Sequence, residues 1–229
     1  MSTKPIAVPI VIPGKKRVFL VEDHPVTREG FAQLINYQPD LTVCGQADTV
    51  KLALAGIQEA RPDLAIVDIS LSESSGLDLI KDLKCQQAAL PVLVLSTHDE
   101  ALYAERALRA GARGYVMKQA PTSEVMKAIR AVLAGGLYLS DTMQTRVVRQ
   151  QFDHSKPRAR AELAGLSDRE LQVFELLGHG HTTRRIATRL HVSVSTVETH
   201  RAHLKEKLRL TNAVQLVRRA VEWVTRSKD

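Results

Sequence analysis

The segment VFLVEDHP (Val18–Pro25) joins a continuous apolar run to two acidic residues. Four consecutive apolar residues, without polar alternation, are typical of a parallel strand that is buried on both faces. Similar runs recur along the first half of the chain, and the expected strands are Val18–Val21, Leu41–Cys44, Leu64–Val67, Val92–Leu95 and Gly114–Met117.

Amphipathic segments with helical spacing alternate with these strands. The expected helices are Val26–Asn36, Val50–Ala60, Leu77–Lys84, Ala101–Ala110 and Ser123–Ala134. Thr122 is predicted to cap the last of them, because its hydroxyl can accept a hydrogen bond from the first backbone amides. The alternation predicts an α/β fold with a doubly wound, five-stranded parallel sheet and right-handed crossovers.

After residue 138 the strand pattern disappears. A helix is expected at Ser140–Phe152, and the polar, basic stretch Asp153–Ala164 is predicted to be a linker. Four helical segments with short connections follow, at Asp168–Leu177, Thr183–Leu190, Ser195–Leu208 and Ala213–Thr225. This pattern predicts a second, smaller domain that is all-α.

Charge divides in the same way as secondary structure. Residues 1–138 contain 15 Lys and Arg against 15 Asp and Glu, whereas residues 139–229 contain 17 against 10, so the second part carries the whole net charge of +7. A basic domain joined to a neutral one predicts that the second domain faces a polyanion. A well-solvated basic surface is the alternative.

The chain shows no sign of export or membrane insertion. No apolar run approaches the roughly 20 residues of a membrane-spanning helix, and Met1–Pro13 lacks the apolar centre of a signal peptide. Cys44 and Cys85 have no metal-type spacing and are expected to be buried, reduced thiols. A cytoplasmic protein without a membrane partner is expected.

Acidic and basic side chains stand where the predicted strands end. Glu22–Asp23 follow the first strand, Asp68 the third, Ser96 the fourth and Lys118 the fifth. Ligands of doubly wound sheets bind at this edge, and oxygen-only acidic clusters suit Mg²⁺. Asp68 is therefore a candidate nucleophile toward a phosphoryl group, whose charge Lys118 and Ser96 would share. For any single acid, an ordinary capping or surface carboxylate is the alternative.

Four segments, taken together, resemble a CheY-like receiver domain, the phosphoacceptor of two-component signalling. They are VFLVEDHP (Val18–Pro25), DLAIVDISL (Asp63–Leu71), VLVLST (Val92–Thr97) and AGARGYVMK (Ala110–Lys118). The resemblance implies the strand order 2-1-3-4-5. The sequence departs from the family pattern at Glu22, where an aspartate is commoner, and at Gln119, where many receivers have proline.

The resemblance also implies a role for each site residue. Asp68 is the expected phosphorylation site, and the expected Mg²⁺ ligands are Glu22, Asp23, Asp68 and the carbonyl of Ser70. Ser96 resembles the switch hydroxyl, Tyr115 the switch aromatic and Lys118 the phosphate-binding lysine. A plain core aromatic is an equally good interpretation of Tyr115.

The segment TTRRIATRLHVSVSTVETHRAHLKEKL (Thr182–Leu208) contains two short amphipathic helices joined by a tight connection. Ser195 is predicted to cap the second, and His181–Arg209 contains seven Lys and Arg against two Glu. These features predict a helix-turn-helix with a basic second helix. The alternative is a small bundle with a solvated basic face, and a metal site at His200 and His203 is disfavoured because no further ligand completes it.

This second half resembles a LuxR-type DNA-binding domain, through LSDRE (Leu166–Glu170) and the run Gly180–Leu210. A receiver followed by this domain defines the NarL/FixJ class of response regulators. Glu170 matches a structural acid of the family, and Arg201 is a candidate partner for it. The expected base-facing residues are Glu198, Thr199 and Ala202; further DNA contacts are expected from Thr182, Thr183, Arg184, Ser195, Thr196, His200, Arg201, Lys205 and Lys207.

The expected organisation is a tail (1–16), a receiver (17–134), a linker with a helix (135–164) and a LuxR-type domain (165–229). The leading hypothesis is a response regulator that a sensor histidine kinase phosphorylates on Asp68, and that then dimerises and binds double-stranded DNA. One alternative is a Mg²⁺-dependent phosphatase-like enzyme, which Ser70 disfavours because that chemistry needs a second acid there. The other is a constitutive DNA-binding protein. Because the leading hypothesis only accepts a phosphoryl group on Asp68, no turnover of an external substrate is expected.

Overall fold

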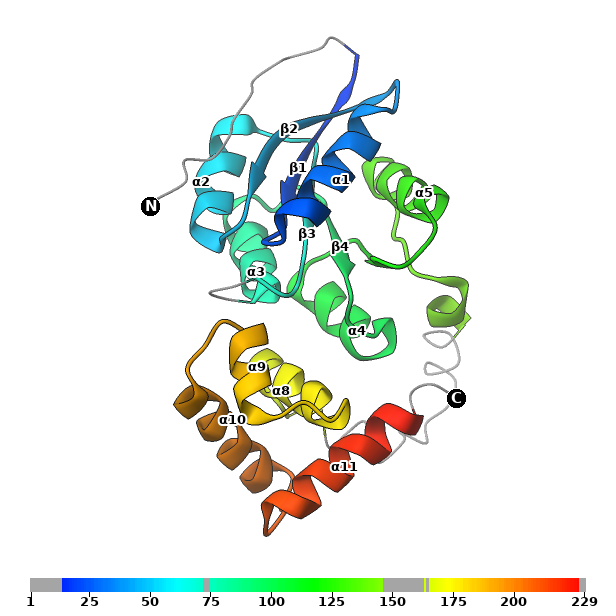
Figure 1. Ribbon diagram of the computed structural model, residues 1–229. Helices are drawn as coiled ribbons and strands as arrows, with labels where there is room; N and C mark the ends of the chain where they lie inside the picture. Colours follow the sequence, from blue (N-terminus) through cyan, green and yellow to red (C-terminus); the bar gives the residue numbers. More distant parts are fainter. Residues whose placement is uncertain (1–13, 72–74, 146–162, 164, 227–229) are drawn as a thin grey trace. The chain divides into compact units, whose positions relative to one another are not determined.

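The computed structural model describes residues 14–71, 75–145, 163 and 165–226 (Figure 1). The chain divides into two compact units between Thr145 and Arg146. Residues 137–145, which the sequence analysis placed in the linker, group with the first unit.

The first unit is built on a five-stranded parallel sheet in the order β2-β1-β3-β4-β5, which confirms the predicted topology. The strands are β1 (Lys16–Val21), β2 (Leu41–Ala47), β3 (Leu64–Val67), β4 (Val92–Ser96) and β5 (Gly114–Met117). β3 and β4 are buried along their whole length, as expected for strands covered on both faces.

Helices cover both faces of the sheet (Figure 1). They are α1 (Pro25–Asn36), α2 (Val50–Ala60), α3 (Gly76–Gln86), α4 (Glu100–Ala110) and α5 (Thr122–Leu133). Apolar side chains of α1 and α5 share one core cluster with alternate residues of the strands, and α3 lies between α2 and α4. The prediction of Thr122 as a cap was wrong: Thr122 is the first residue of α5, and Pro121 precedes it without a side-chain cap.

The chain after α5 returns to the edge of the sheet. Tyr138 pairs with Gly114 in a parallel bridge, where its carbonyl accepts from the amide of Tyr115 at 3.0 Å and its own amide donates to Arg113 at 3.0 Å. Of the helix expected at Ser140–Phe152, residues 141–145 are helical and the rest lies outside the described residues.

The second unit contains α8 (Asp168–Gly178), α9 (Thr183–Arg189), α10 (Val194–Lys207) and α11 (Ala213–Arg226), all four where the sequence placed helices. Ser167 and Glu170 form a reciprocal capping box at the start of α8. The cap of α10 was predicted two residues too late: Ser193 accepts from the amide of Thr196, and Ser195 lies in the first turn. Both serines have a hydroxyl that can cap a helix. Ser193 is the cap because its hydroxyl lies next to the backbone amide of the residue three positions later, Thr196.

Both cysteines are free, and Cys44 is buried. Cys85 is exposed, contrary to prediction, because Leu79, Ile80 and Leu83 occupy the inner face of α3. Among the described residues, no helix is long and apolar enough to cross a membrane.

Gly76 brings α3 against the backbone of Asp68. A Cβ at this position would lie 1.9 Å from the carbonyl oxygen of Asp68, so any side chain forces the two segments apart. The amide of Gly76 donates to the carbonyl of Ile69 at 2.9 Å, which fixes the turn after β3.

Gly76→Ala is expected to lower the free energy of unfolding by about 1–3 kcal/mol, the usual cost of overpacking a tight site. Urea unfolding followed by circular dichroism measures it. Gly30→Ala is the control, because its Cβ meets nothing within 4 Å and alanine favours a helix by up to about 1 kcal/mol. Equal stability of the two variants would contradict this account of Gly76.

Candidate functional site

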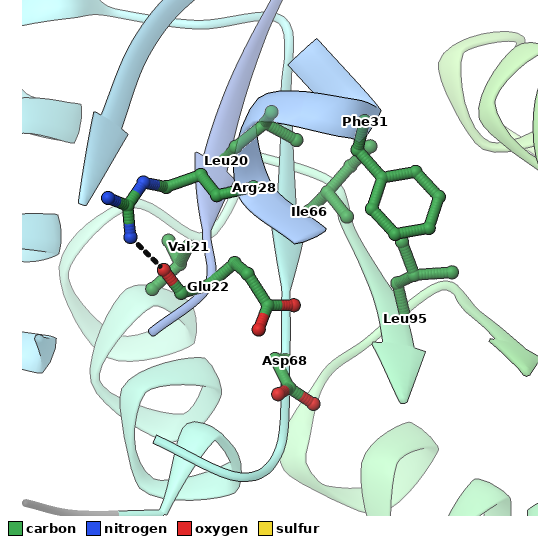
Figure 2. Close-up of a pocket in the computed structure, with 8 residues that line it drawn as sticks. All are labelled: Leu20, Val21, Glu22, Arg28, Phe31, Ile66, Asp68 and Leu95. Atoms are coloured by element: carbon green, nitrogen blue, oxygen red, sulfur yellow. Dashed lines mark hydrogen bonds between the residues drawn. The ribbon is translucent and has the colours of Figure 1, made fainter. Parts of the chain in front are cut away.

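The carboxyl ends of β1, β3 and β5 bring Glu22, Asp68 and Lys118 together. Lys118 Nζ lies 2.5 Å from Glu22 Oε2 and 2.8 Å from Asp68 Oδ2. Asp68 is only 2% exposed and Glu22 5%, and Figure 2 shows the carboxyl group of Glu22 directed toward that of Asp68. Three predicted site residues therefore meet at one edge of the sheet.

The acidic cluster fits a divalent cation. One ligand atom from each of Glu22, Asp23, His24 and Asp68 lies within 4.8 Å of the others. Asp68 Oδ1 is buried without a hydrogen-bond partner among the described residues. Hard oxygen ligands around such an unpaired oxygen are what Mg²⁺ requires.

His24 was not predicted as a site residue. Its Nδ1 lies 2.9 Å from Asp23 Oδ1 and 3.2 Å from Glu22 Oε1. Its position directly after the acidic pair was the available signal. Arg28 was also missed; its guanidinium donates to the carbonyl of Glu22 at 2.6 Å (Figure 2) and so fixes the acidic turn from α1.

Ser96 and Tyr115 are both fully buried behind the acidic cluster. The amide of His98 donates to Ser96 Oγ at 3.2 Å, and the Tyr115 hydroxyl donates to the carbonyl of His98 at 2.7 Å. The His98 ring lies 2.6 Å from Ser70 Oγ through Nε2. His98, which the sequence analysis passed over, thus links both expected switch residues to the loop that follows Asp68.

The DNA-facing residues predicted on α10 lie on its outer side. Val197 and Leu204 are fully buried, whereas Glu198, Thr199 and Ala202 are exposed. Thr182 caps α9, and Arg184 is exposed in that helix. Exposure therefore agrees with the base-facing prediction for Glu198, Thr199 and Ala202, whereas the Arg201 side chain is only 18% exposed.

The partner of Glu170 is Lys207, which corrects the expectation of Arg201. Lys207 Nζ donates to Glu170 Oε2 at 2.7 Å, so the phosphate contact predicted for Lys207 has a competing role. Burial opposes ionisation, but the hydrogen bonds from Lys207 and the Ser167 amide outweigh it and lower the pKa of Glu170. Arg201 turns instead to Thr183 and Glu198.

Comparison with known sequences matches both units to families. Residues 18–130 match the response regulator receiver domain, and residues 164–220 match the bacterial regulatory proteins of the luxR family. The chain is 37% identical to the transcriptional regulatory protein UhpA of Escherichia coli over 202 residues, covering 88% of this chain and 96% of UhpA. The chain belongs to the two-component response regulators.

Two further relatives agree with this membership. The oxygen regulatory protein NreC of Staphylococcus carnosus is 31% identical over 210 residues, covering 90% of this chain and 97% of NreC. A solved LuxR-family two-component response regulator from Aurantimonas sp. SI85-9A1 superposes with a TM-score of 0.57 at 29% identity, covering 61% of this chain and 99% of its own. The predicted receiver and LuxR-type domains are confirmed.

Burial sets the protonation of the acceptor carboxyl in this response regulator. It raises the pKa of Asp68 to about 6; Lys118 lowers that pKa and Glu22 raises it, each by less than burial. For Lys118, burial opposes the charged form, but attraction to Asp68 and Glu22 is stronger and its pKa rises. The reactive carboxylate form of Asp68 is therefore costly to keep in the apo fold.

In buffer without divalent cations, the stability difference between Asp68→Asn and the unchanged chain is expected to depend on pH. A carboxyl with a raised pKa binds its proton more tightly in the folded state. The free energy of unfolding of the unchanged chain therefore falls as the pH rises from about 4 to about 6, and below about 4 Asp68 costs no stability. A shift of this size corresponds to about 3 kcal/mol. Urea unfolding at several pH values measures it, and a constant difference between pH 4 and 7 would contradict the raised pKa.

Proposed function

We propose that this response regulator accepts a phosphoryl group on Asp68 from a sensor histidine kinase and then binds double-stranded DNA as a dimer. The observation that carries the proposal is the position of Asp68. It is a buried carboxylate with one oxygen held by Lys118 at 2.8 Å and the other unpaired.

An oxygen of Asp68 attacks the phosphorus of a phosphohistidine, the P–N bond breaks, and the imidazole leaves with the bonding electrons. Lys118 then binds a phosphoryl oxygen, and the buried Ser96 hydroxyl is the next donor along the same edge. Glu22, Asp23, Asp68 and the carbonyl of Ser70 would hold Mg²⁺, which supplies positive charge for the phosphoryl oxygens. The acyl phosphate stays on the chain, so no external substrate is turned over.

The exposed face of α1 suits the kinase. Val26 and Tyr37 are 86% and 88% exposed, and Leu34 lies between them on the same side of the helix. Since α1 begins two residues after Asp23, a kinase that presents its phosphohistidine to Asp68 meets this apolar stripe. Exposed apolar surface of this kind is typical of a partner site.

The second unit supplies the DNA contacts and a dimer surface. The N-terminal turns of a recognition helix such as α10 approach base edges in the major groove. Val214, Val217 and Val221 form an exposed apolar stripe along α11, beside its buried Leu216 and Ala220. A second copy of this stripe is the proposed partner, because two-fold dimers match the symmetry of paired DNA half-sites. DNA and kinase partners imply a cytoplasmic location.

The start of the linker offers a route from the receiver to the DNA-binding unit. Ser140 donates to Glu100 twice, through its amide at 3.0 Å and through its hydroxyl. Glu100 is the first residue of α4, and α4 begins four residues after Ser96. A rearrangement of the loop around Ser96 therefore acts directly on the residue that holds Ser140.

After treatment with acetyl phosphate and Mg²⁺, intact-mass measurement is expected to show one phosphoryl adduct on the unchanged chain and none on Asp68→Asn. Asp78→Asn is the matched control, because Asp78 is an exposed aspartate whose partner is Lys81 on the same helix. A full adduct on Asp68→Asn, or none on the unchanged chain, would reject Asp68 as acceptor.

Ser140→Ala is expected to leave phosphorylation intact but reduce the gain in DNA affinity that phosphorylation produces, by about ten-fold, since it removes a hydrogen bond to a charged group. Fluorescence anisotropy with labelled DNA, with and without acetyl phosphate, measures this ratio. Ser123→Ala, at an exposed serine of α5, should keep the full ratio. If both variants keep it, the linker contact does not transmit the signal.

A further inference from the structure

Glu198 is an acidic side chain on the surface that is expected to face DNA. It is 54% exposed on α10, within a segment that has seven Lys and Arg against two Glu. An unpaired carboxylate here would repel the DNA phosphates, because like charges across an interface are costly. A base-reading glutamate therefore needs a counter-charge that does not itself compete for the base.

Arg201 supplies that charge from one turn further along the helix. Its Nη1 lies 2.8 Å from Glu198 Oε1 and 2.5 Å from the hydroxyl oxygen of Thr183. The side chain is only 18% exposed, and its Nε is buried without a partner among the described residues. The guanidinium is thus mostly shielded from solvent and is held by Glu198 and Thr183.

We propose that Arg201 is a positioning residue for base recognition: it holds and neutralises Glu198, and it is not a phosphate contact. The inference rests on the proposed DNA-binding function. Because Arg201 occupies Oε1, the carboxylate is held in one orientation, and Oε2 is left to accept from the amino group of a cytosine. The rotamer freedom of Glu198 is restricted before DNA arrives, which favours binding by preorganisation.

The contact with Thr183 extends this role to the geometry of the motif. Thr183 is the first residue of α9, so Arg201 joins the start of one helix to the base-reading face of the next. Both contacts come from the same nitrogen, Nη1, which stands one atom further from the backbone than a lysine Nζ. Lysine at this position would keep the charge but would not place it at that point.

The two roles open to Arg201 differ in a measurable way. Loss of a phosphate contact flattens the dependence of log affinity on log salt by about 0.9 and weakens all DNA sequences equally. Loss of a positioning residue leaves that slope unchanged and relaxes the preference for one base. Lys205→Ala is the matched control for the first behaviour, since Lys205 has no acidic partner that the structure shows among its described residues.

The test uses the full chain after acetyl phosphate treatment, with a randomised duplex library to find the preferred site and anisotropy titrations at several salt concentrations. Arg201→Met is expected to reduce the affinity ratio between the preferred base and the others at one base pair by about five- to fifty-fold. The slope of log affinity against log salt should stay the same as in the unchanged chain. Glu198→Ala should relax the same base pair, and the double variant should relax it no further. Lys205→Ala should flatten the slope and keep the base preference.

A flatter slope with full base preference in Arg201→Met would make Arg201 a phosphate contact and overturn the proposal. If Arg201→Met binds no DNA, Arg201→Lys decides: a relaxed base pair with an unchanged slope supports the positioning role, and full discrimination overturns it. Additive losses in the double variant would also overturn it. If the unchanged chain binds no duplex after phosphorylation, the proposed function itself fails. This outcome is read from the unchanged chain alone, so it is distinct from every result with the variants.

Discussion

The ammonium group of Lys118 lies between two buried carboxylates, and the receiver unit is arranged around this contact. Glu22, Asp68 and Lys118 follow the ends of β1, β3 and β5, so their meeting requires β1, β3, β4 and β5 to lie side by side in that order. Burying unpaired charge is very unfavourable. Together with Asp23 the cluster has three carboxylates, and the single ammonium group leaves two negative charges unbalanced. One divalent cation balances them. The charge of the cluster therefore suits a divalent cation, in agreement with the phosphoryl acceptor proposed for this site.

Glu170 and Lys207 form a similar pair in the second unit, with the opposite electrostatic outcome. There the Ser167 amide and Lys207 satisfy the carboxylate, and the pKa of Glu170 falls. At Asp68 burial dominates, and the pKa rises to about 6. A carboxylate satisfied by hydrogen bonds is stable in its charged form, which suits a structural role for Glu170. A buried carboxyl with a raised pKa is typical of functional sites, which agrees with the role proposed for Asp68.

The strands, their order and the meeting of Asp68 and Lys118 at one edge could be predicted from the sequence, because hydrophobic periodicity and sheet topology determine them. Buried parallel strands end at one edge, so Asp68 and Lys118 had to converge once the strands were recognised. Side-chain partners follow from rotamers and spacing, which a sequence does not display. Arg201 was a reasonable partner for Glu170 by charge alone, but Glu198, three residues before it, lies on the same helix face and takes its guanidinium. The return of Tyr138 to the sheet edge carried no strand pattern, because a single bridge needs none.

Tyr115 has contacts of two kinds, and they differ in what they can transmit. Its hydroxyl donates to the carbonyl of His98 on the switch loop, while its amide donates to Tyr138 at the start of the linker. Rotation of the side chain leaves the backbone contact unchanged, so this contact anchors the linker and does not report the switch. The hydrogen bonds from Ser140 end on Glu100 of α4, which continues the loop containing Ser96 and His98. A shift of α4 would stretch or release them. The bridge to Tyr138 therefore anchors the start of the linker, and the contact between Ser140 and Glu100 is the one that depends on the position of α4.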